Sequence, residues 1–300
     1  MKILVIGGTG TVGSHVVPGL AAGGHAVRVL TRSSTKAQAA PAGIEARVGD
    51  LTDPMGLGMA FDGVEGVFLL NALSPTEAQE GLAAIEWCKR AGVRKVVYLS
   101  VQAADEALHI PHFGSKVVIE MALARSGIDH TILRPNNFFQ NDNRSGGALI
   151  GYGLYPQPIG DKGLSRVDVR DVADAAVASF TDPAASNQTF VVAGAMRLTS
   201  GMVASFYAQA LGSGVVAMDD LDEWEEQCRQ QMLPDWLVFD LRMMYEYFQT
   251  RGLAALPAEI ERTEKLIGHP MRKFTAYVTE AVRAWQQAGI RPKQPKRHMC

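Results

Sequence analysis

Short apolar runs rich in β-branched residues recur through the first half of the chain, and stretches of helical character separate most of them. Each run is continuously apolar rather than alternating in polarity, which is typical of strands buried on both faces. We expect strands at residues 2–6, 26–31, 66–70, 95–100 and 131–134, with helices such as 74–91 and 115–126 between them. This alternation predicts an α/β fold of the Rossmann type, with a doubly wound parallel sheet.

The pattern changes near residue 145, where a loop-rich stretch of glycines and prolines begins, and from Glu223 onward the chain is mostly helical in character. We expect a dinucleotide-binding Rossmann domain at residues 1–145. Residues 146–300 are expected to form a smaller, mostly helical substrate-binding lobe, partly interleaved with that domain. Residues 234–248 are rich in methionine and aromatic side chains, which can line a large flat pocket or form ordinary core; both interpretations stay open.

Composition excludes several classes of function. Hydrophobic residues make up 47% of the 300 and the formal net charge is -2, which does not favour a nucleic-acid or anionic-membrane surface. The basic run at residues 293–298 is interpreted as a solvated tail. No apolar run approaches the roughly 18 residues of a membrane span. Cys88, Cys228 and Cys300 are odd in number and far apart, which favours a reducing compartment over disulfides. We expect a cytoplasmic protein that acts on a small molecule, and leave a homodimer open.

A glycine-rich segment follows the first predicted strand directly and opens the helix after it. The segment Gly7-Gly8-Thr9-Gly10-Thr11-Val12-Gly13 matches the spacing G-x-G-x-x-G. In a dinucleotide site the middle glycine lets the backbone approach the pyrophosphate, and the last lets the helix pack closely. We therefore expect a pyrophosphate site made by Gly7, Thr9, Gly10, Thr11, Val12 and Gly13. The alternative is a glycine-rich turn without a ligand. Pro18 falls inside the expected helix and should kink it.

The end of the second predicted strand indicates which dinucleotide binds. NAD enzymes usually have an acid there, whereas this chain has Thr31 and Arg32. Arg32 can pair with a 2′-phosphate, so we expect NADP(H) in preference to NAD(H); the alternative is a plain surface arginine. Asp50 and Leu51 follow the third strand and are expected at the adenosine. Asp50 can bond the adenine amino group or simply cap a turn with Thr52.

Several motifs occur in order at a spacing that resembles one family. They are the glycine loop, Thr31-Arg32, Gly49-Asp50-Leu51, the segments at residues 91–100, 112–116 and 133–139, and later ones at residues 167–173 and 268–285. The chain resembles the NmrA-like group of atypical short-chain dehydrogenases/reductases through almost its whole length. That resemblance implies either an NADPH-dependent reductase of quinones, azo dyes or triphenylmethane dyes, or a catalytically silent dinucleotide sensor that binds a regulator.

The resemblance also assigns candidate catalytic residues. Ordinary short-chain dehydrogenases use a Ser followed by Tyr-x-x-x-Lys, and here Ser100 and Lys116 match while His112 occupies the tyrosine position. The spacing places His112 and Lys116 on one helix face, where Lys116 can hold the nicotinamide ribose. His112 can donate a proton or form a hydrogen-bonded pocket wall. A metal pair of His109 and His112 is disfavoured because no third ligand is evident and Pro111 lies between them, so we expect no metal.

The remaining candidates lie where predicted strands end, which is where an open α/β sheet binds ligands. These residues are Asn71, Ala72, Pro135, Asn136, Asn137 and Phe138. The resemblance places the last group beside the nicotinamide, although Phe138 suits core packing equally well. Asp168 and Asp171 are not expected to be catalytic, and Asp171 is predicted to cap a helix with support from Asp174.

Two functions from different classes follow. The first is a reductase that transfers hydride from NADPH to an activated acceptor such as a quinone, imine, enone or dye, which needs little help from a protein acid. The second is a silent NADP(H) sensor. The presence of Lys116 and the apolar lobe favour the enzyme, and the missing tyrosine favours the sensor.

Overall fold

The computed structural model describes residues 1–291, so the basic run at 293–298 and Cys300 lie outside the described residues. The chain divides into two compact units. The first unit consists of residues 1–136, 169–193 and 255–271. The second consists of residues 137–168, 194–254 and the segment from residue 272 onward. The two units therefore alternate along the sequence.

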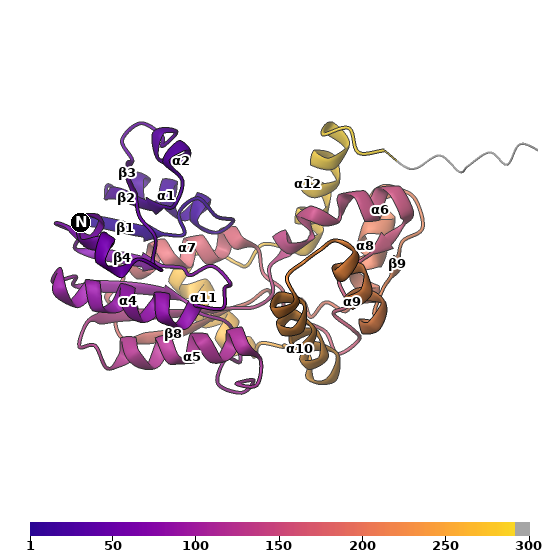
Figure 1. The fold of residues 1–300 in the computed structure, drawn as a ribbon. Helices are drawn as coiled ribbons and strands as arrows, with labels where there is room; N and C mark the ends of the chain where they lie inside the picture. The colour runs from indigo at the N-terminus through magenta and orange to yellow at the C-terminus, as the bar shows by residue number, and fades with distance from the viewer. Residues whose placement is uncertain (292–300) are drawn as a thin grey trace, which may run out of the picture. The chain divides into compact units, whose positions relative to one another are not determined.

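A seven-stranded parallel sheet forms the centre of the first unit (Figure 1). Its strands are β1 (Lys2–Ile6), β2 (Ala26–Thr31), β3 (Glu45–Val48), β4 (Gly66–Leu69), β5 (Lys95–Leu99), β6 (Asp129–Pro135) and β8 (Gln188–Val192). The order across the sheet is β3-β2-β1-β4-β5-β6-β8. The predicted Rossmann-type fold is confirmed, and β6 extends beyond residues 131–134 at both ends.

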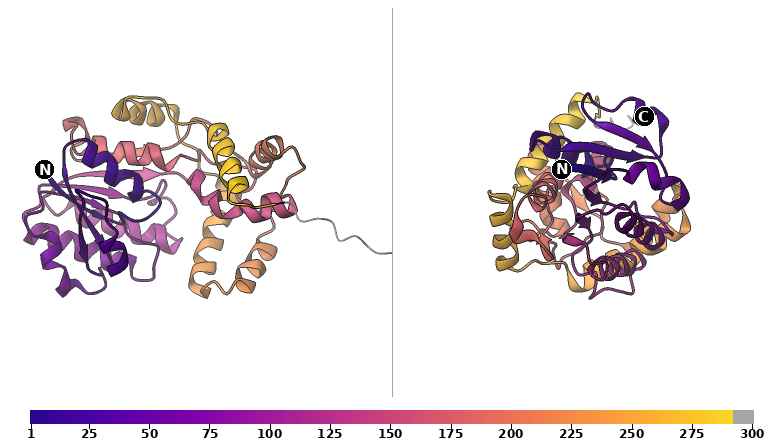
Figure 2. Two further views of the ribbon diagram at one scale, coloured as in Figure 1. Left: turned by 90° about the horizontal axis from the view of Figure 1, so that it is seen from above. Right: turned by 90° about the vertical axis from the view of Figure 1, so that its left-hand side faces the viewer.

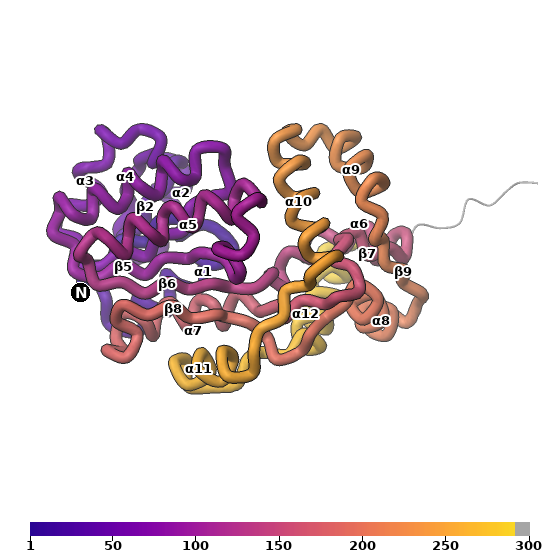
Figure 3. The backbone as a smooth tube through the Cα atoms, turned by 90° about the horizontal axis from the view of Figure 1, so that it is seen from below, coloured from indigo at the N-terminus to yellow at the C-terminus, as the bar shows by residue number. Residues whose placement is uncertain are grey.

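Helices cover both faces of this sheet, whose central strands are largely buried and mainly apolar. The helices of the first unit are α1 (Gly13–Ala22), α2 (Ser34–Gln38), α3 (Gly58–Phe61), α4 (Glu77–Arg90), α5 (Pro111–Ala124), α7 (Val169–Ser179) and α11 (Pro257–Ile267), with 3₁₀ turns η1 (Pro54–Leu57) and η3 (Pro183–Ala185). Figure 3 shows α4 and α5 on one side of β5, β6 and β8, with α7 and α11 on the other. The late helix α11 lies beside α7 and β8 (Figure 2, left).

Helix α1 accommodates Pro18 without ending. The helix continues from Gly13 to Ala22, and Pro18 is on its exposed side. The next residue, Gly19, faces α7, where a Cβ would lie 2.9 Å from Val177 Cγ2. Gly19 thus allows α1 and α7 to pack closely. Pro18 lies on the exposed side of α1, where water can bind the carbonyl that the proline leaves without a backbone donor.

The second unit is built from helices and a small parallel sheet of β7 (Leu154–Tyr155) and β9 (Val216–Ala217). Its helical segments are η2 (Phe139–Ser145), α6 (Gly146–Tyr152), α8 (Ser200–Leu211), α9 (Leu221–Gln230), α10 (Asp235–Arg251) and α12 (Phe274–Gln287). Aromatic rings of Phe139, Tyr207, Phe274 and Trp285 pack against one another in its core. Within residues 1–291, every helix is too short or too polar to cross a bilayer.

Candidate active site

The glycine loop joins β1 to α1 and lies against the segment that follows β4. Gly7 has φ +79°, and a Cβ on it would lie 2.9 Å from the carbonyl oxygen of Leu70. Gly13 is more constrained, because its Cβ would lie 2.2 Å from the oxygen of Gly7 and 2.6 Å from Gly8 Cα. Only glycine fits at these positions, so the start of α1 folds directly onto the loop.

The outer side of this loop is open. A Cβ on Gly10 would meet a single atom within 4 Å, the oxygen of Gly7 at 3.2 Å, and Thr9 and Thr11 are exposed as well. Among the described residues, the amides of Thr11, Val12 and Gly13 find no backbone acceptor, while Val12 itself is buried. Exposed backbone beside free amides at a helix N-terminus is what a pyrophosphate requires.

The ends of β2 and β3 carry Arg32 and Asp50. The Gly49 amide donates to the carbonyl of Thr31 at 3.0 Å, which keeps the two strand ends together. Asp50 Oδ1 accepts the Thr52 amide at 3.0 Å, so the turn-capping alternative is present in the structure. The bond from the Thr52 amide, with a smaller contribution from the positive charge of Arg32, lowers the pKa of Asp50. Arg32 is exposed, and the Leu51 side chain is buried in the core.

Buried polar atoms without partners mark the ends of β4 and β5. Asn71 is 4% exposed and Ser100 is 3% exposed. Within residues 1–291, both amide atoms of Asn71 and the hydroxyl of Ser100 lack a hydrogen-bond partner. Ala72, next to Asn71, is exposed. Burying a polar atom without a partner costs free energy, and such exceptions in a native protein commonly mark a functional site.

Lys116 is engaged by a residue that the sequence analysis did not single out. Its Nζ lies 2.7 Å from Oε1 of Glu77, the first residue of α4. The Glu77 side chain is 1% exposed and that of Lys116 is 12% exposed. Burial raises the pKa of Glu77, and the charge and hydrogen bond of Lys116 partly oppose this effect. Glu77 was missed because an acid in the first turn of a helix is commonplace.

The ring of Tyr98 lies under the ammonium group. Lys116 Nζ is 5.9 Å from the ring centroid, within cation–π range. Burial raises the pKa of Tyr98 well above its usual value, so its hydroxyl is a neutral phenol. Among the described residues, this hydroxyl and Glu77 Oε2 have no hydrogen-bond partner. The two atoms add to the unpartnered polar groups found at Asn71 and Ser100.

Close packing of α4 on α5 brings this ion pair together. Gly81, one turn after Glu77, faces Ile119, and a Cβ there would lie 2.4 Å from Ile119 Cδ1. Helix α5 begins at Pro111 rather than at the predicted residue 115, since proline suits the first helical position. His112 therefore lies in the first turn of α5, half-buried, with its ring edge-on to Phe113 at 4.7 Å between centroids.

The end of β6 is divided between the units. Pro135 and Asn136 belong to the first unit, where the buried Asn136 amide donates to Gln102 Oε1 at 2.7 Å. Asn137 and Phe138 belong to the second unit. There Asn137 Oδ1 accepts from Arg166 Nε at 2.9 Å, and the Phe138 carbonyl accepts from Arg166 Nη2 at 2.7 Å.

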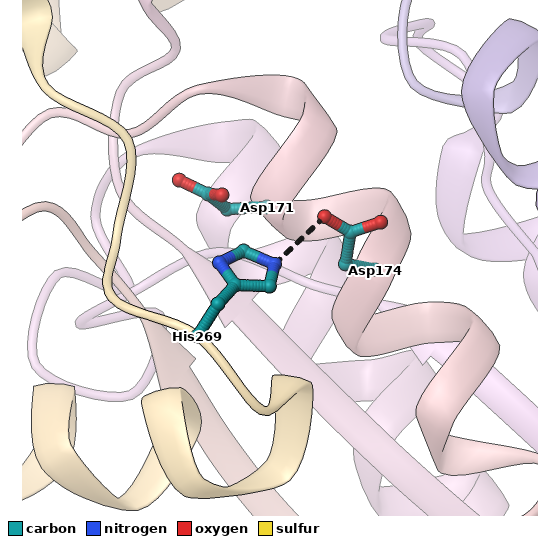
Figure 4. A group of neighbouring side chains, drawn as sticks. All are labelled: Asp171, Asp174 and His269. Atoms are coloured by element: carbon teal, nitrogen blue, oxygen red, sulfur yellow. Dashed lines mark hydrogen bonds and ion pairs between the residues drawn. The ribbon is translucent and has the colours of Figure 1, made fainter.

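A separate cluster of possible metal ligands occurs in the first unit. The ligand atoms of Asp171, Asp174 and His269 lie within 4.8 Å of one another. His269 Nε2 contacts Asp174 Oδ2 at 3.1 Å, and its Nδ1 faces the Pro270 carbonyl, so the ring joins α7 to the segment after α11 (Figure 4). The predicted N-cap at Asp171 is wrong: α7 begins at Val169, so Asp171 is already in the first turn.

Helix α10 contains the methionine- and aromatic-rich stretch. Val238, Tyr245 and Phe248 are buried, which agrees with the core interpretation for that face. Trp236 and Phe239 remain 38% and 62% exposed. The helix thus has a core face and an apolar exposed face, and the sequence pattern alone does not separate the two.

The chain is similar to several known proteins along almost its whole length. The model of the NmrA-like family matches residues 1–277. An NAD(P)H azoreductase from Xenophilus azovorans is 31% identical over 279 residues, 92% of this chain and 96% of the relative. A (4-alkanoyl-5-oxo-2,5-dihydrofuran-3-yl)methyl phosphate reductase from Streptomyces griseus is 27% identical, covering 94% and 99%. The crystal structure of an Escherichia coli NADPH-dependent quinone oxidoreductase with NADPH has a TM-score of 0.82 and 26% identity, covering 93% and 99%.

Proposed function

Because the chain belongs to the NmrA-like family, we propose that it is an NADPH-dependent reductase that transfers hydride to an activated small organic acceptor. Suitable acceptors are quinones, imines, enones and dye-like azo compounds. The observation that carries the proposal is the full-length similarity to an NAD(P)H azoreductase, together with a glycine loop shaped for a pyrophosphate. Such acceptors need little protonation by the protein, which suits a site with histidine where ordinary relatives have tyrosine.

The residues present fit the dinucleotide. The open backbone of Gly7, Thr9, Gly10, Thr11, Val12 and Gly13 would hold the pyrophosphate at the start of α1. Arg32 would pair with the 2′-phosphate, with Asp50 and the backbone of Leu51 at the adenosine. The unpartnered amide of Asn71 and hydroxyl of Ser100 supply donors and acceptors at the strand ends, beside the exposed Ala72.

The reacting end of the site is assigned to four side chains of the first unit. Lys116 binds the nicotinamide ribose, Ser100 and Pro135 lie at the ends of β5 and β6, and His112 donates the proton or walls the pocket. When bound, the reduced nicotinamide supplies the hydride. Asn137 and Phe138 follow β6 and are proposed to contact the nicotinamide. We assign the part of residues 146–300 that lies in the second unit, including the exposed face of α10, to substrate binding.

Turnover tests the proposal directly. NADPH carrying deuterium at the transferred position is incubated with a panel of quinones, azo dyes, imines and enones. We expect stereospecific deuteride transfer to at least one acceptor at a rate well above the control without protein. NADPH binding without transfer to any acceptor, together with a protein partner captured only in the presence of NADP+ or only of NADPH, would contradict the enzyme and support a sensor.

Cofactor preference tests the role of Arg32. We expect wild-type protein to bind NADP(H) more tightly than NAD(H), and Arg32→Ala to remove most of that preference, on the order of 1–3 kcal/mol for a charge-assisted contact. Titration calorimetry with all four dinucleotides measures it. Arg47, exposed on the neighbouring strand β3, offers a control in Arg47→Ala, which should leave the preference intact. Equal wild-type affinities for the two dinucleotides would overturn the assignment.

The cytoplasm is proposed as the compartment from the cysteines. Cys88 and Cys228 are free and buried, and burial raises the pKa of the Cys88 thiol to about 12, which makes it unreactive. Thiols of this kind suit a reducing compartment. A homodimer is the assembly that we propose to examine first, by light scattering.

A further inference from the structure

The ion pair between α4 and α5 is unusual in its surroundings. Glu77 and Lys116 come from α4 and α5 near their N-terminal ends, and both side chains are largely removed from water. Burying a carboxylate is costly unless a cation and hydrogen bonds compensate for the lost hydration. The pair therefore differs from the surface ion pair of Arg90 with Glu86 on the same helix α4, where both side chains are about half exposed.

Glu77 limits where the Lys116 ammonium can lie. A lysine side chain has four rotatable bonds and loses considerable conformational entropy when it is fixed. Here Glu77 Oε1 holds Nζ at 2.7 Å while the ring of Tyr98 lies beneath it at 5.9 Å. Since part of the entropic cost is met before any ligand arrives, a ligand that uses the remaining N–H groups binds more tightly.

We propose that Glu77 is a positioning residue of the reductase, which holds the Lys116 ammonium in place for the ribose of the dinucleotide. This inference rests on the proposed function. It assigns Glu77 no contact with substrate or cofactor, and it makes the affinity for NADPH depend on a carboxylate that acts through Lys116.

The unfinished hydrogen bonding of the pair supports this role over a purely structural one. Within residues 1–291, Glu77 Oε2 and the Tyr98 hydroxyl are buried without partners. A pair kept only for stability would be expected to satisfy these atoms, because each unsatisfied buried group costs about 1–3 kcal/mol. Each such group calls for an explanation, and a role in holding Lys116 for a ligand is the explanation that we propose.

The charges that face the pair predict a pH signature. Glu77 is influenced by Lys116 and His112 on α5 and by Glu80 on its own helix, and Tyr98 on β5 is influenced by Glu77 and Glu120. Lys116 is the nearest cation to Glu77, at hydrogen-bond distance. Removing the carboxylate charge leaves a nearly buried ammonium without its counter-ion, so the affinity for NADPH should depend on pH differently in a variant without this charge.

The experiment measures NADPH affinity by fluorescence titration between pH 6 and pH 10, for Glu77→Gln, Lys116→Met and the double variant. We expect Glu77→Gln to weaken NADPH binding about tenfold at neutral pH and to move the alkaline loss of affinity to lower pH. Lys116→Met should bind NADPH at least as weakly as Glu77→Gln. Its plot of affinity against pH should lack the fall at alkaline pH, which we call the alkaline limb. The double variant should match Lys116→Met, since the two residues act as one unit.

Glu80→Gln is the matched control. Glu80 lies on α4 and is also buried, but its Oε1 accepts from the hydroxyls of Ser74 and Thr76 at 2.8 and 2.7 Å. It should lower the melting temperature without moving the alkaline limb. If Glu77→Gln folds poorly, Glu77→Asp retains the charge on a shorter side chain and should keep the limb near its wild-type pH while weakening affinity.

Different results would overturn the role of Glu77 and the proposed reductase function. A wild-type protein that binds NADPH and turns over, with a Glu77→Gln variant of equal affinity and an unchanged alkaline limb, would overturn the role of Glu77 alone. Additive losses in the double variant would do the same. A wild-type protein that neither binds NADPH nor reduces any acceptor would overturn the proposed function first.

Discussion

Among the described residues, each unit of the molecule contains a deeply buried ion pair, and the two pairs are built differently. In the second unit, Arg166 and Asp142 are both fully buried. Asp142 accepts from Arg166 Nη2 at 2.8 Å and from the hydroxyls of Tyr207 and Tyr155 at 2.9 and 3.3 Å. Arg166 also donates from Nη1 to Asp142 Oδ2 at 3.1 Å, from Nε to Asn137 Oδ1 and from Nη2 to the Phe138 carbonyl. Both charged groups of this pair therefore have several partners.

The pair in the first unit has only one hydrogen bond between its members. Glu77 Oε1 binds Lys116, while Glu77 Oε2 and the neighbouring Tyr98 hydroxyl find no partner among residues 1–291. A fully satisfied network rigidifies a core, whereas a partly satisfied one is costly and needs another reason to exist. Burial of an ion pair therefore does not by itself indicate a site, and the two pairs differ in how many hydrogen bonds their atoms make.

The pKa shifts of the groups in and around the two pairs also differ. Burial alone would lower the pKa of Arg166, but the carboxylate of Asp142 raises it above its already high usual value, so Arg166 stays charged. Burial also raises the pKa of Tyr155 and Tyr207, which keeps both phenols neutral as donors. In the first unit, burial raises the pKa of Glu77 against the opposing charge of Lys116. Of these two pairs, the one formed by Glu77 and Lys116 therefore contains an acid whose pKa is raised by burial.

The largest expected effect comes from removing the charge of Asp142, whose ion pair with Arg166 is fully hydrogen-bonded. Asp142→Asn keeps the size of the side chain and removes the charge that balances Arg166. Since the arginine would remain buried without its counter-ion, we expect a loss of about 3–5 kcal/mol in the free energy of unfolding. Urea denaturation followed by far-UV circular dichroism measures this loss.

A surface pair provides the control for that experiment. Asp161 lies 3.7 Å from Lys162 and its side chain is 86% exposed, so Asp161→Asn should leave the urea midpoint unchanged. An Asp142→Asn variant as stable as wild type would show that the network in the second unit does not depend on charge, and the contrast between the two pairs would fail.

The next largest effect tests whether close packing of α4 on α5 is needed to bring Glu77 and Lys116 together. Gly81→Ala places a Cβ 2.4 Å from Ile119 Cδ1, so α4 and α5 must move apart. Alanine alone stabilises a helix interior by roughly 0.8–1 kcal/mol, and overpacking costs about 1–3 kcal/mol, so we expect a net loss of stability. NADPH affinity should fall as well, because Glu77 and Lys116 are separated. Denaturation and fluorescence titration measure the two effects.

Gly201→Ala is the corresponding control in the second unit. Gly201 lies in α8, and no atom of another element is within 4 Å of the position that a Cβ would take, so alanine should keep or slightly raise stability and leave NADPH affinity unchanged. If Gly81→Ala kept the wild-type affinity despite lower stability, close approach of α4 and α5 would not be required for the role of Lys116.

The sequence predicts the sheet well because each strand is marked by an apolar run of its own residues. The apolar runs give β1 and β2 with their observed ends, and the glycine loop lies where its spacing places it. The family resemblance singles out Ser100 and Lys116 as candidates, and their roles stay predictions. It does not single out Glu77, because the pairing of Glu77 depends on two helices meeting at Gly81 and Ile119, which are distant in sequence. The start of α5 and the beginning of α7 were misplaced because prolines and aspartates suit several positions near a helix start.

The smallest expected effect is the pH dependence that the unsatisfied pair imparts to stability. Burial raises the pKa of Glu77 above its ordinary value of 4.5, so the folded protein holds this proton where the unfolded chain has already released it. Its contribution is therefore fully present below pH 4.5 and is lost as pH rises through the folded pKa. One proton bounds the slope at about 1.4 kcal/mol per pH unit. Glu77→Gln cannot titrate, so the difference in unfolding free energy, wild type minus Glu77→Gln, should fall as pH rises above 4.5.

Urea midpoints at half-unit steps of pH measure this difference, with Glu80→Gln as the reference for buried acids of α4. A difference that instead rose with pH would mean that Lys116 outweighs burial and lowers the pKa of Glu77, which would make the first pair as firmly charged as that of Arg166 and Asp142.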